Sequence, residues 1–177
     1  MKVLLSLIVV VDLLSIPVMA ADYPKAEAFA GYQFLHVGNG ADVNANGWDA
    51  SLTGNFNKYF GVTGDFSGSY KTINIGGSNV DAKIYSYSGG PVLNLNHEGT
   101  VNPFVHALFG GAHLGASLSG AGSGSTNGFT MMYGGGADVK MSKLLALRGQ
   151  VDWVYYRFSG VGESKNVRMA VGVVFRF

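Results

Sequence analysis

The chain has 177 residues and a formal net charge of +1 at pH 7, and only 13% of its residues are charged. A soluble domain carries about 25% charged residues, yet no stretch after the N-terminal segment is apolar over the roughly 20 residues of a transmembrane helix. The absence of cysteine excludes disulfides, thiolate metal sites and a cysteine nucleophile. The near-zero net charge, without a basic patch, argues against nucleic-acid binding.

The N-terminal segment predicts a secretory signal peptide at residues 1–20. A short positive start precedes the apolar residues 3–14, which Asp12 interrupts, and small residues before Ala21 fit a signal-peptidase site. The alternative, an uncleaved N-terminal anchor, is disfavoured because the apolar run is shorter than a membrane span. We therefore expect residues 21–177 to be the exported domain.

Apolar and small polar residues alternate with a period of two, which predicts β-strands rather than helices. The first four strands are expected at residues 25–37, 47–57, 59–70 and 81–93. In the third, Phe60 and Phe66 share one face, and Asp65 and Ser67 share the other. Ile84 breaks this alternation in the fourth strand.

The second half of the chain continues the pattern, with strands expected at residues 101–114, 129–139, 145–158 and 166–177. The fifth strand is the least regular, and we place Val105 and Phe109 outward and His106 inward. Long connections rich in Gly, Asn and Ser are expected at residues 38–46, 71–80, 115–128 and 159–165. Short turns separate the other strands, so long and short connections alternate.

The last strand shows the design most clearly, because one of its faces is wholly apolar while Arg168 and Arg176 share the other with small residues. A soluble strand would bury the apolar face and leave the arginines in water. A membrane barrel strand turns the apolar face to lipid and the arginines into the lumen. About eight strands of about 10 residues match the smallest membrane barrels. We predict an all-β fold: an eight-stranded antiparallel up-and-down transmembrane β-barrel, with both termini and the short turns in the periplasm.

Several segments resemble a known family. GWDASLTGNFNKYFGVTGDFSGSY, PFVHALFGG, GGGADVK, LALRGQVDWVYYRF and NVRMAVGVVFRF together look like the outer-membrane β-barrel family typified by the OmpA transmembrane domain. The resemblance implies the outer membrane of a Gram-negative bacterium. It also implies that Val173, Phe175 and Phe177 form the signal read by the barrel-assembly machinery.

Two sets of side chains stand out once the faces are assigned. Inward charges are predicted to form a lumen network of Glu27, Asp65, Asp138, Arg148, Asp152, Arg168 and Arg176. Outward aromatics are predicted to form girdles at the membrane interfaces, comprising Trp48, Phe56, Phe60, Tyr70, Tyr85, Trp153 and Tyr155. We expect the lumen charges to be structural, since a barrel of this size is filled by its own side chains and buried charges must pair. A gate or ion path is the alternative.

Other motifs indicate no cofactor or metal. Asp42, Asn44 and Asn46 begin like a calcium loop, but Thr53 stands where the bidentate glutamate is required. The glycines at 120–124 lack the lysine and helix of a phosphate loop. The four histidines are scattered, and no motif supports His113 with Ser117 as a catalytic pair, so we do not expect an enzyme.

The first functional hypothesis is a monomeric structural or surface-interaction protein that works through its extracellular loops. Its expected partners are outer-membrane lipid, lipopolysaccharide, and host or envelope proteins. A narrow pore for small solutes or ions is the alternative, followed by a lipid-modifying barrel enzyme. A soluble lipocalin-like carrier is disfavoured because the apolar faces would overfill so narrow a lumen.

Overall fold

The computed structural model describes residues 23–38, 43–75, 78–96, 99–118, 122–158 and 161–177. The predicted signal peptide and its cleavage site lie outside these residues. The strands are β1 (Ala26–Val37), β2 (Val43–Asn55), β3 (Phe60–Ile75), β4 (Ser78–Asn94), β5 (Val101–Leu118), β6 (Gly122–Lys140), β7 (Leu145–Phe158) and β8 (Val161–Arg176). None of the described residues forms a helix that is long and apolar enough to span a membrane.

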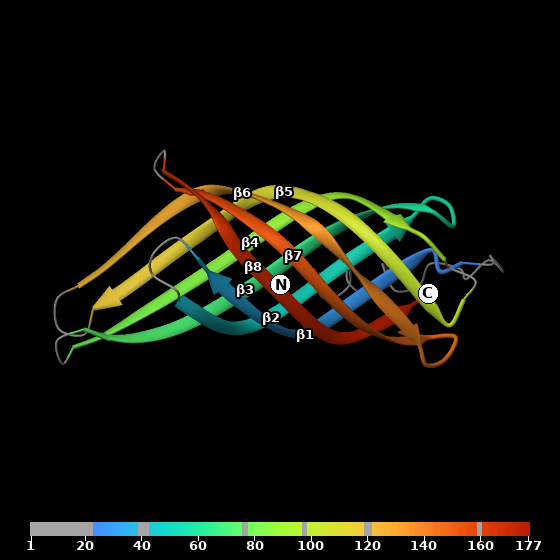
Figure 1. The fold of residues 1–177 in the computed structure, drawn as a ribbon, viewed down its shortest axis with the longest axis horizontal. Coiled ribbons are helices and arrows are strands. Elements are labelled where there is room, and N and C mark those ends of the chain that lie inside the picture. Colours follow the sequence, from blue (N-terminus) through green and yellow to red (C-terminus); the bar gives the residue numbers. More distant parts are fainter. Residues whose placement is uncertain (1–22, 39–42, 76–77, 97–98, 119–121, 159–160) are drawn as a thin grey trace, which may run out of the picture.

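The eight strands form one closed antiparallel barrel in sequence order, in which β8 pairs with β1 (Figure 1). The predicted fold is confirmed. Along β7 the side chains alternate between exposed and buried from Leu145 to Val154. The exposed face of β7 and its neighbours carries large apolar side chains such as Leu147, Val151 and Met169. The alternation of apolar and polar residues in the sequence therefore corresponds to the outer and inner faces of the barrel wall.

The ends of several strands differ from the sequence prediction. The expected loops at 38–46, 71–80, 115–128 and 159–165 are largely strand, because β2 begins at Val43, β3 reaches Ile75, β5 reaches Leu118 and β8 begins at Val161. These segments are polar and glycine-rich. Lys71, Thr72 and Asn74 of β3 are exposed, and backbone hydrogen bonds hold such a strand end without requiring hydrophobic alternation. The pattern used to find strands is therefore absent there, whereas at the start of β2 Ala45 is buried in the lumen.

The two ends of the barrel are different (Figure 1). We call the end with the β2–β3, β4–β5 and β6–β7 turns and the C-terminus the turn end. At the opposite end, β3 to β6 extend beyond their neighbours. The β2–β3 pairing stops at Asn46↔Tyr70 and the β6–β7 pairing stops at Gly128↔Phe158. Residues 71–75 and 78–82, with 113–118 and 122–127, therefore form a projecting end whose two outer strand edges lack a β2 or β7 partner.

Candidate functional site in the barrel lumen

Arg148 organises a charged cluster near the turn end of the lumen. Its Nε and Nη2 donate to Oδ1 and Oδ2 of Asp138 at 2.7 and 2.8 Å. Nη2 also donates to Glu27 Oε2 at 3.3 Å, and Nε of Arg176 donates to Glu27 Oε1 at 3.3 Å. All four side chains are buried. Two carboxylates face two guanidinium groups, so the charges of this turn-end cluster balance.

Aromatic rings cover the Arg148 guanidinium. Its Cζ lies 4.5 Å from the centroid of the Phe104 ring and 5.5 Å from that of Phe29. Both rings are buried inside the barrel. The positive charge is attracted by the ring faces as well as by the carboxylates.

Arg168 organises a second cluster in the middle of the lumen. Its Nη1 and Nη2 donate to the two carboxylate oxygens of Asp65 at 2.8 and 3.0 Å. Its Nε donates to Oδ2 of Asp152 at 2.9 Å, and Nη1 lies 3.6 Å from Oδ2 of Asp49. Because β8 supplies Arg168 and β3 supplies Asp65, this mid-lumen cluster joins strands that are not neighbours in the barrel wall.

Three members of the mid-lumen cluster were missed from the sequence. Asp49 contacts Arg168 as above, His106 Nε2 lies 2.7 Å from Oδ1 of Asp152, and Gln150 Nε2 donates to Oδ2 of Asp49 at 3.1 Å. All three side chains are buried in the lumen, and of these only His106 was placed inward above. The sequence pattern did not indicate the position of these side chains along the barrel axis, because that position depends on how the strands are staggered.

The mid-lumen cluster is not balanced in charge. Three carboxylates, those of Asp49, Asp65 and Asp152, surround the single guanidinium of Arg168, and His106 is the neighbouring imidazole. The Arg168 side chain is 1% exposed. In a buried, hydrogen-bonded network of this kind, loss of one partner is strongly destabilising.

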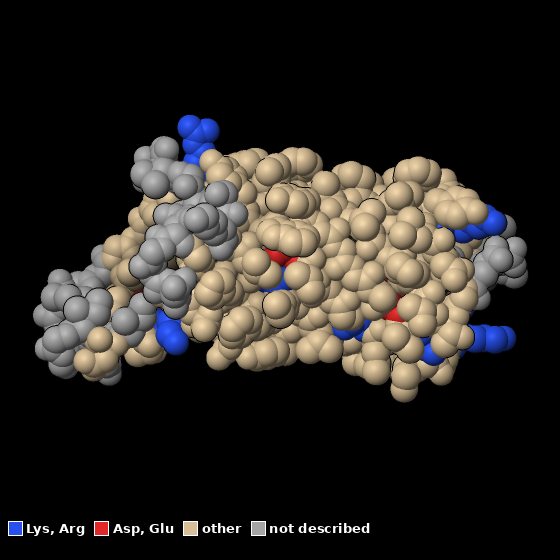
Figure 2. Space-filling view, in the orientation of Figure 1, with Lys and Arg blue, Asp and Glu red and all other residues tan. Residues whose placement is uncertain are grey.

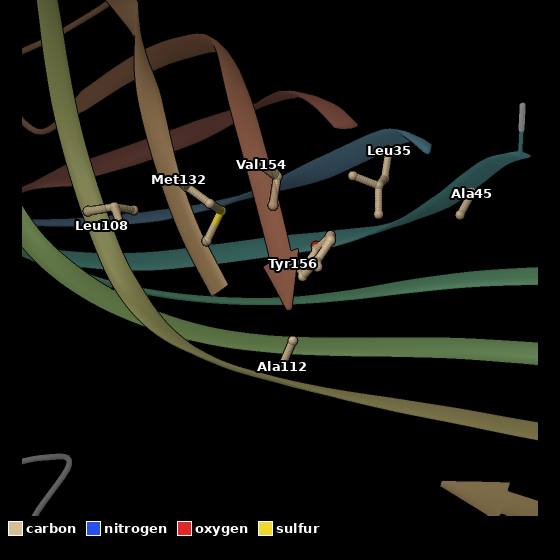
Figure 3. Close-up of a cluster of buried hydrophobic side chains, with 7 residues drawn as sticks. All are labelled: Leu35, Ala45, Leu108, Ala112, Met132, Val154 and Tyr156. Atoms are coloured by element: carbon tan, nitrogen blue, oxygen red, sulfur yellow. The ribbon is translucent and has the colours of Figure 1, made fainter. Parts of the chain in front are cut away.

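An apolar layer lies in the lumen in addition to the charged clusters. Figure 3 shows its side chains, which come from strands around the barrel: Leu35, Ala45, Leu108, Ala112, Met132, Val154 and Tyr156. Ile84 packs against this layer. The interpretation that Ile84 breaks the alternation was therefore wrong. Ile84 points inward like Ser86 and Ser88, at a height along the barrel axis where the lumen is apolar.

Polar side chains fill much of the remaining lumen. Buried hydrogen bonds join Gln33 to Ser69 at 2.7 Å, Ser67 to Ser86 at 2.7 Å and Thr53 to Thr63 at 2.9 Å. A cavity of about 10 Å³ lies between the two charged clusters, lined by residues that include Asp65, His106 and Arg148. A volume of this size suits about one water molecule. It is far smaller than a ligand pocket.

The family of this protein is shown by a comparison that covers nearly the whole chain. A model of the outer membrane protein β-barrel domain matches residues 6–177. The chain belongs to this outer-membrane β-barrel family. No curated protein matches the sequence.

Solved structures of other outer-membrane barrels have similar folds. Ail of Yersinia pestis, in complex with the heparin analogue sucrose octasulfate, is 23% identical with a TM-score of 0.66, covering 88% of this chain and 99% of that one. Neisserial surface protein A is 12% identical with a TM-score of 0.73, covering 86% and 97%. The barrel domain of Pseudomonas aeruginosa OprF is 13% identical with a TM-score of 0.57, covering 88% and 99%. At these identities the likeness concerns the fold.

The lipid-facing surface of this family member carries a hydrogen-bonded aromatic chain near the projecting end. Trp48 Nε1 donates to the Tyr70 hydroxyl at 3.1 Å, and that hydroxyl donates to the Tyr85 hydroxyl at 3.3 Å. Between β1 and β2, Tyr32 donates to Asn46, and between β5 and β6 His113 bonds Asn127. This collar of polar and aromatic groups is typical of a membrane–water interface.

The other predicted girdle residues fall into two groups. Phe56 and Phe60 are exposed at the turn end, and Trp153 is exposed and stacks on Tyr133 with ring centroids 5.9 Å apart. Tyr155 is only half-exposed, at a register shift between Val154 and Tyr156. Val173 and Phe175 lie on the exposed face of β8, and Phe177, which follows the strand, is also exposed. That the assembly machinery recognises them stays a prediction.

The residues of the rejected motifs serve other contacts. Asn44 lies in β2 and bonds His36 Nδ1 at 2.7 Å, and Asn46 accepts from Tyr32. Asp42 lies outside the described residues. His113 bonds Asn127 at 2.7 Å across β5 and β6. Within the described ranges, no group of three or more His, Cys, Asp or Glu side chains is placed to hold a metal ion.

Proposed function

We propose that this chain is an outer-membrane protein with a closed lumen that acts through its projecting end. The observation that carries the proposal is the mid-lumen cluster, in which Arg168 of β8 is bound across the lumen to Asp65 of β3 and also to Asp152 of β7. The apolar layer supports it, because ion pairs and apolar side chains in the described part of the lumen obstruct the passage of solutes. The surface is then the part that can meet a partner.

The strand edges of the projecting end suggest how a partner binds. Among the described strands, residues 71–73 of β3 lie beyond the last residue paired with β2, and residues 122–125 of β6 lie beyond the last residue paired with β7. The open side of a strand presents backbone N–H and C=O groups that an extended peptide can pair with. We propose an extended segment of a host or envelope protein as the partner, and lipopolysaccharide as the surrounding lipid.

The sulfated ligand of the Ail structure suggests a polyanion as another partner. In the described part of the projecting end and the adjoining strand ends, the exposed charged side chains include Lys71, Lys83 and Arg157, and also Asp81, which accepts a hydrogen bond from Thr72. These cations outnumber the single carboxylate, so the choice of a peptide as partner rests on the strand edges and not on charge. We also propose that the protein is monomeric and not an enzyme.

Conductance tests the closed lumen against a narrow pore, the second candidate, which the small cavity between the charged clusters favours. In planar bilayers, we expect the wild-type protein to give no reproducible channel. Reproducible, ion-selective steps would establish the pore instead. The variant Arg148→Ala separates a gate from a plug: a gate predicts higher conductance with unchanged thermal stability, whereas a structural plug predicts lower thermal stability.

Single cysteines test which end faces outward, because the chain has no cysteine of its own. Ser125→Cys lies on the projecting end and Ser142→Cys on the turn end, and both side chains are exposed. On intact cells, a membrane-impermeant maleimide is expected to label only Ser125→Cys. After the outer membrane is permeabilised, both are expected to react. Labelling of Ser142→Cys alone on intact cells would reverse the orientation and remove the proposed binding surface.

A further inference from the structure

Exposed charged side chains at the turn end have one sign. Lys25, Lys58 and Lys143 are exposed there, and Lys140 is half-buried. The acidic side chains described at this end, Glu27 and Asp138, are buried and paired with arginines; Asp22 and Glu98 lie outside the described residues. Figure 2 shows blue side chains extending from this right-hand end. The described surface of the turn end is therefore cationic.

The same turns carry large apolar side chains in exposed positions. Phe56 is 73% exposed, Met141 67% and Leu144 62%. Tight turns in water are usually built from Gly, Pro, Asn, Asp and Ser, and exposed apolar groups clustered on turns mark a surface that meets something apolar. Because each of these turns also contains an exposed lysine, a single partner that is both apolar and anionic would match both kinds of group.

Lysines beside aromatic rings indicate where the boundary with water lies. The Lys25 ammonium is 4.5 Å from the centroid of the Tyr23 ring and donates to its hydroxyl at 2.7 Å. The Lys58 ammonium is 5.2 Å from the centroid of the Tyr59 ring. Side chains that combine an apolar body with a polar tip, such as Lys and Tyr, favour the headgroup layer of a membrane.

We propose that the turn end is seated in the headgroup layer of the periplasmic leaflet and binds the phosphates of anionic phospholipids through Lys25, Lys58 and Lys143. The exposed apolar side chains of the turns reach the acyl chains below. Anionic phospholipid supplies both required chemistries, because its phosphodiester carries uncompensated negative charge and its tails are apolar. A purely polar polyanion such as peptidoglycan would leave Phe56, Met141 and Leu144 in water.

A tryptophan reporter at the turn end tests this binding. The variant Tyr59→Trp, in a Trp48→Phe and Trp153→Phe background, is reconstituted in vesicles with brominated phosphatidylglycerol or brominated phosphatidylethanolamine. Attraction of basic side chains to anionic lipid predicts a preference for phosphatidylglycerol of about 3-fold in quenching-derived binding constants at low salt. The preference is expected to vanish near 1 M salt, where the Debye length is about 3 Å.

A matched pair of charge-removal variants assigns the preference to the lysines. Lys25→Gln, Lys58→Gln and Lys143→Gln together are expected to abolish it. Lys71→Gln, Lys83→Gln and Arg157→Gln, which remove the same charge from the other end, are expected to leave it intact. Equal quenching by both lipids in the reporter protein, or a preference that survives loss of the turn-end lysines, overturns the proposal. The heat-dependent gel shift of each variant verifies that the barrel has folded, and the single lysine substitutions replace any triple variant that has not.

Discussion

Replacing Arg168 with alanine is expected to lower the free energy of unfolding by about 3–5 kcal/mol. The substitution leaves Asp49, Asp65 and Asp152 buried around a site that has lost its cation. Their mutual repulsion and lost hydrogen bonds, rather than the net strength of the original pairs, cause the large effect. Urea unfolding in lipid vesicles, followed by tryptophan fluorescence, measures the change, and the gel shift on boiling gives an independent midpoint temperature.

Arg157→Ala is the control for this prediction. Arg157 is exposed near the projecting end, so its removal is expected to change the free energy of unfolding by no more than about 0.5 kcal/mol. Arg168→Lys retains the charge but loses the two-pronged contact with Asp65, and an intermediate loss is expected. Equal stability of Arg168→Ala and wild type would show that the mid-lumen cluster contributes nothing to holding the barrel together.

Valine at Gly110 is expected to destabilise the barrel by about 3 kcal/mol or more, at the upper end of what overpacking costs. Gly110 of β5 lies opposite Ser88 of β4, and a Cβ at this position would overlap the carbonyl oxygen of Tyr87. The obstacle is backbone rather than a flexible side chain, so the two strands must separate to accommodate it. The same urea unfolding measurement applies, and loss of the heat-dependent gel shift is the expected result if the strands cannot separate.

Gly149→Val provides the matched comparison. Gly149 lies on the exposed face of β7, and a Cβ there meets nothing within 4 Å. Valine favours strands over glycine by up to about 1 kcal/mol, and here its side chain would face lipid. We expect a neutral or slightly stabilising effect. If both valines destabilise the barrel equally, the cost comes from losing glycine itself and not from the close approach of β4 and β5.

The strand faces could be predicted from sequence because each wall strand separates lipid from a narrow interior. Phe66 and Asp65, adjacent in β3, lie on opposite faces as the alternation requires. The strand ends beyond Tyr70 could not be predicted, since neither face is buried there. The rule that inward residues are polar also failed at Ile84, because the lumen contains an apolar layer as well as charged clusters.

Which lumen side chains contact one another could not be predicted from the sequence of any single strand. Glu27 and Arg176 face each other where β1 meets β8, which the closed topology alone suggested. Asp49 and Gln150 meet across the lumen from β2 and β7. Their contact depends on the stagger of all the strands between them. Sequence periodicity gives the direction of a side chain but not its height along the barrel axis.

The closing contact between β1 and β8 has a consequence for how the protein forms. Glu27 bonds Arg148 and Arg176, which lie 121 and 149 residues away along the chain. These are among the most sequence-distant contacts possible in the molecule, and high contact order slows folding. The Glu27 carboxylate therefore meets its cations only when the last two strands have arrived. Until the barrel closes, the sheet has two edge strands with unpaired backbone groups, which can pair with other chains and aggregate. We therefore expect chaperones to matter most in the interval before closure.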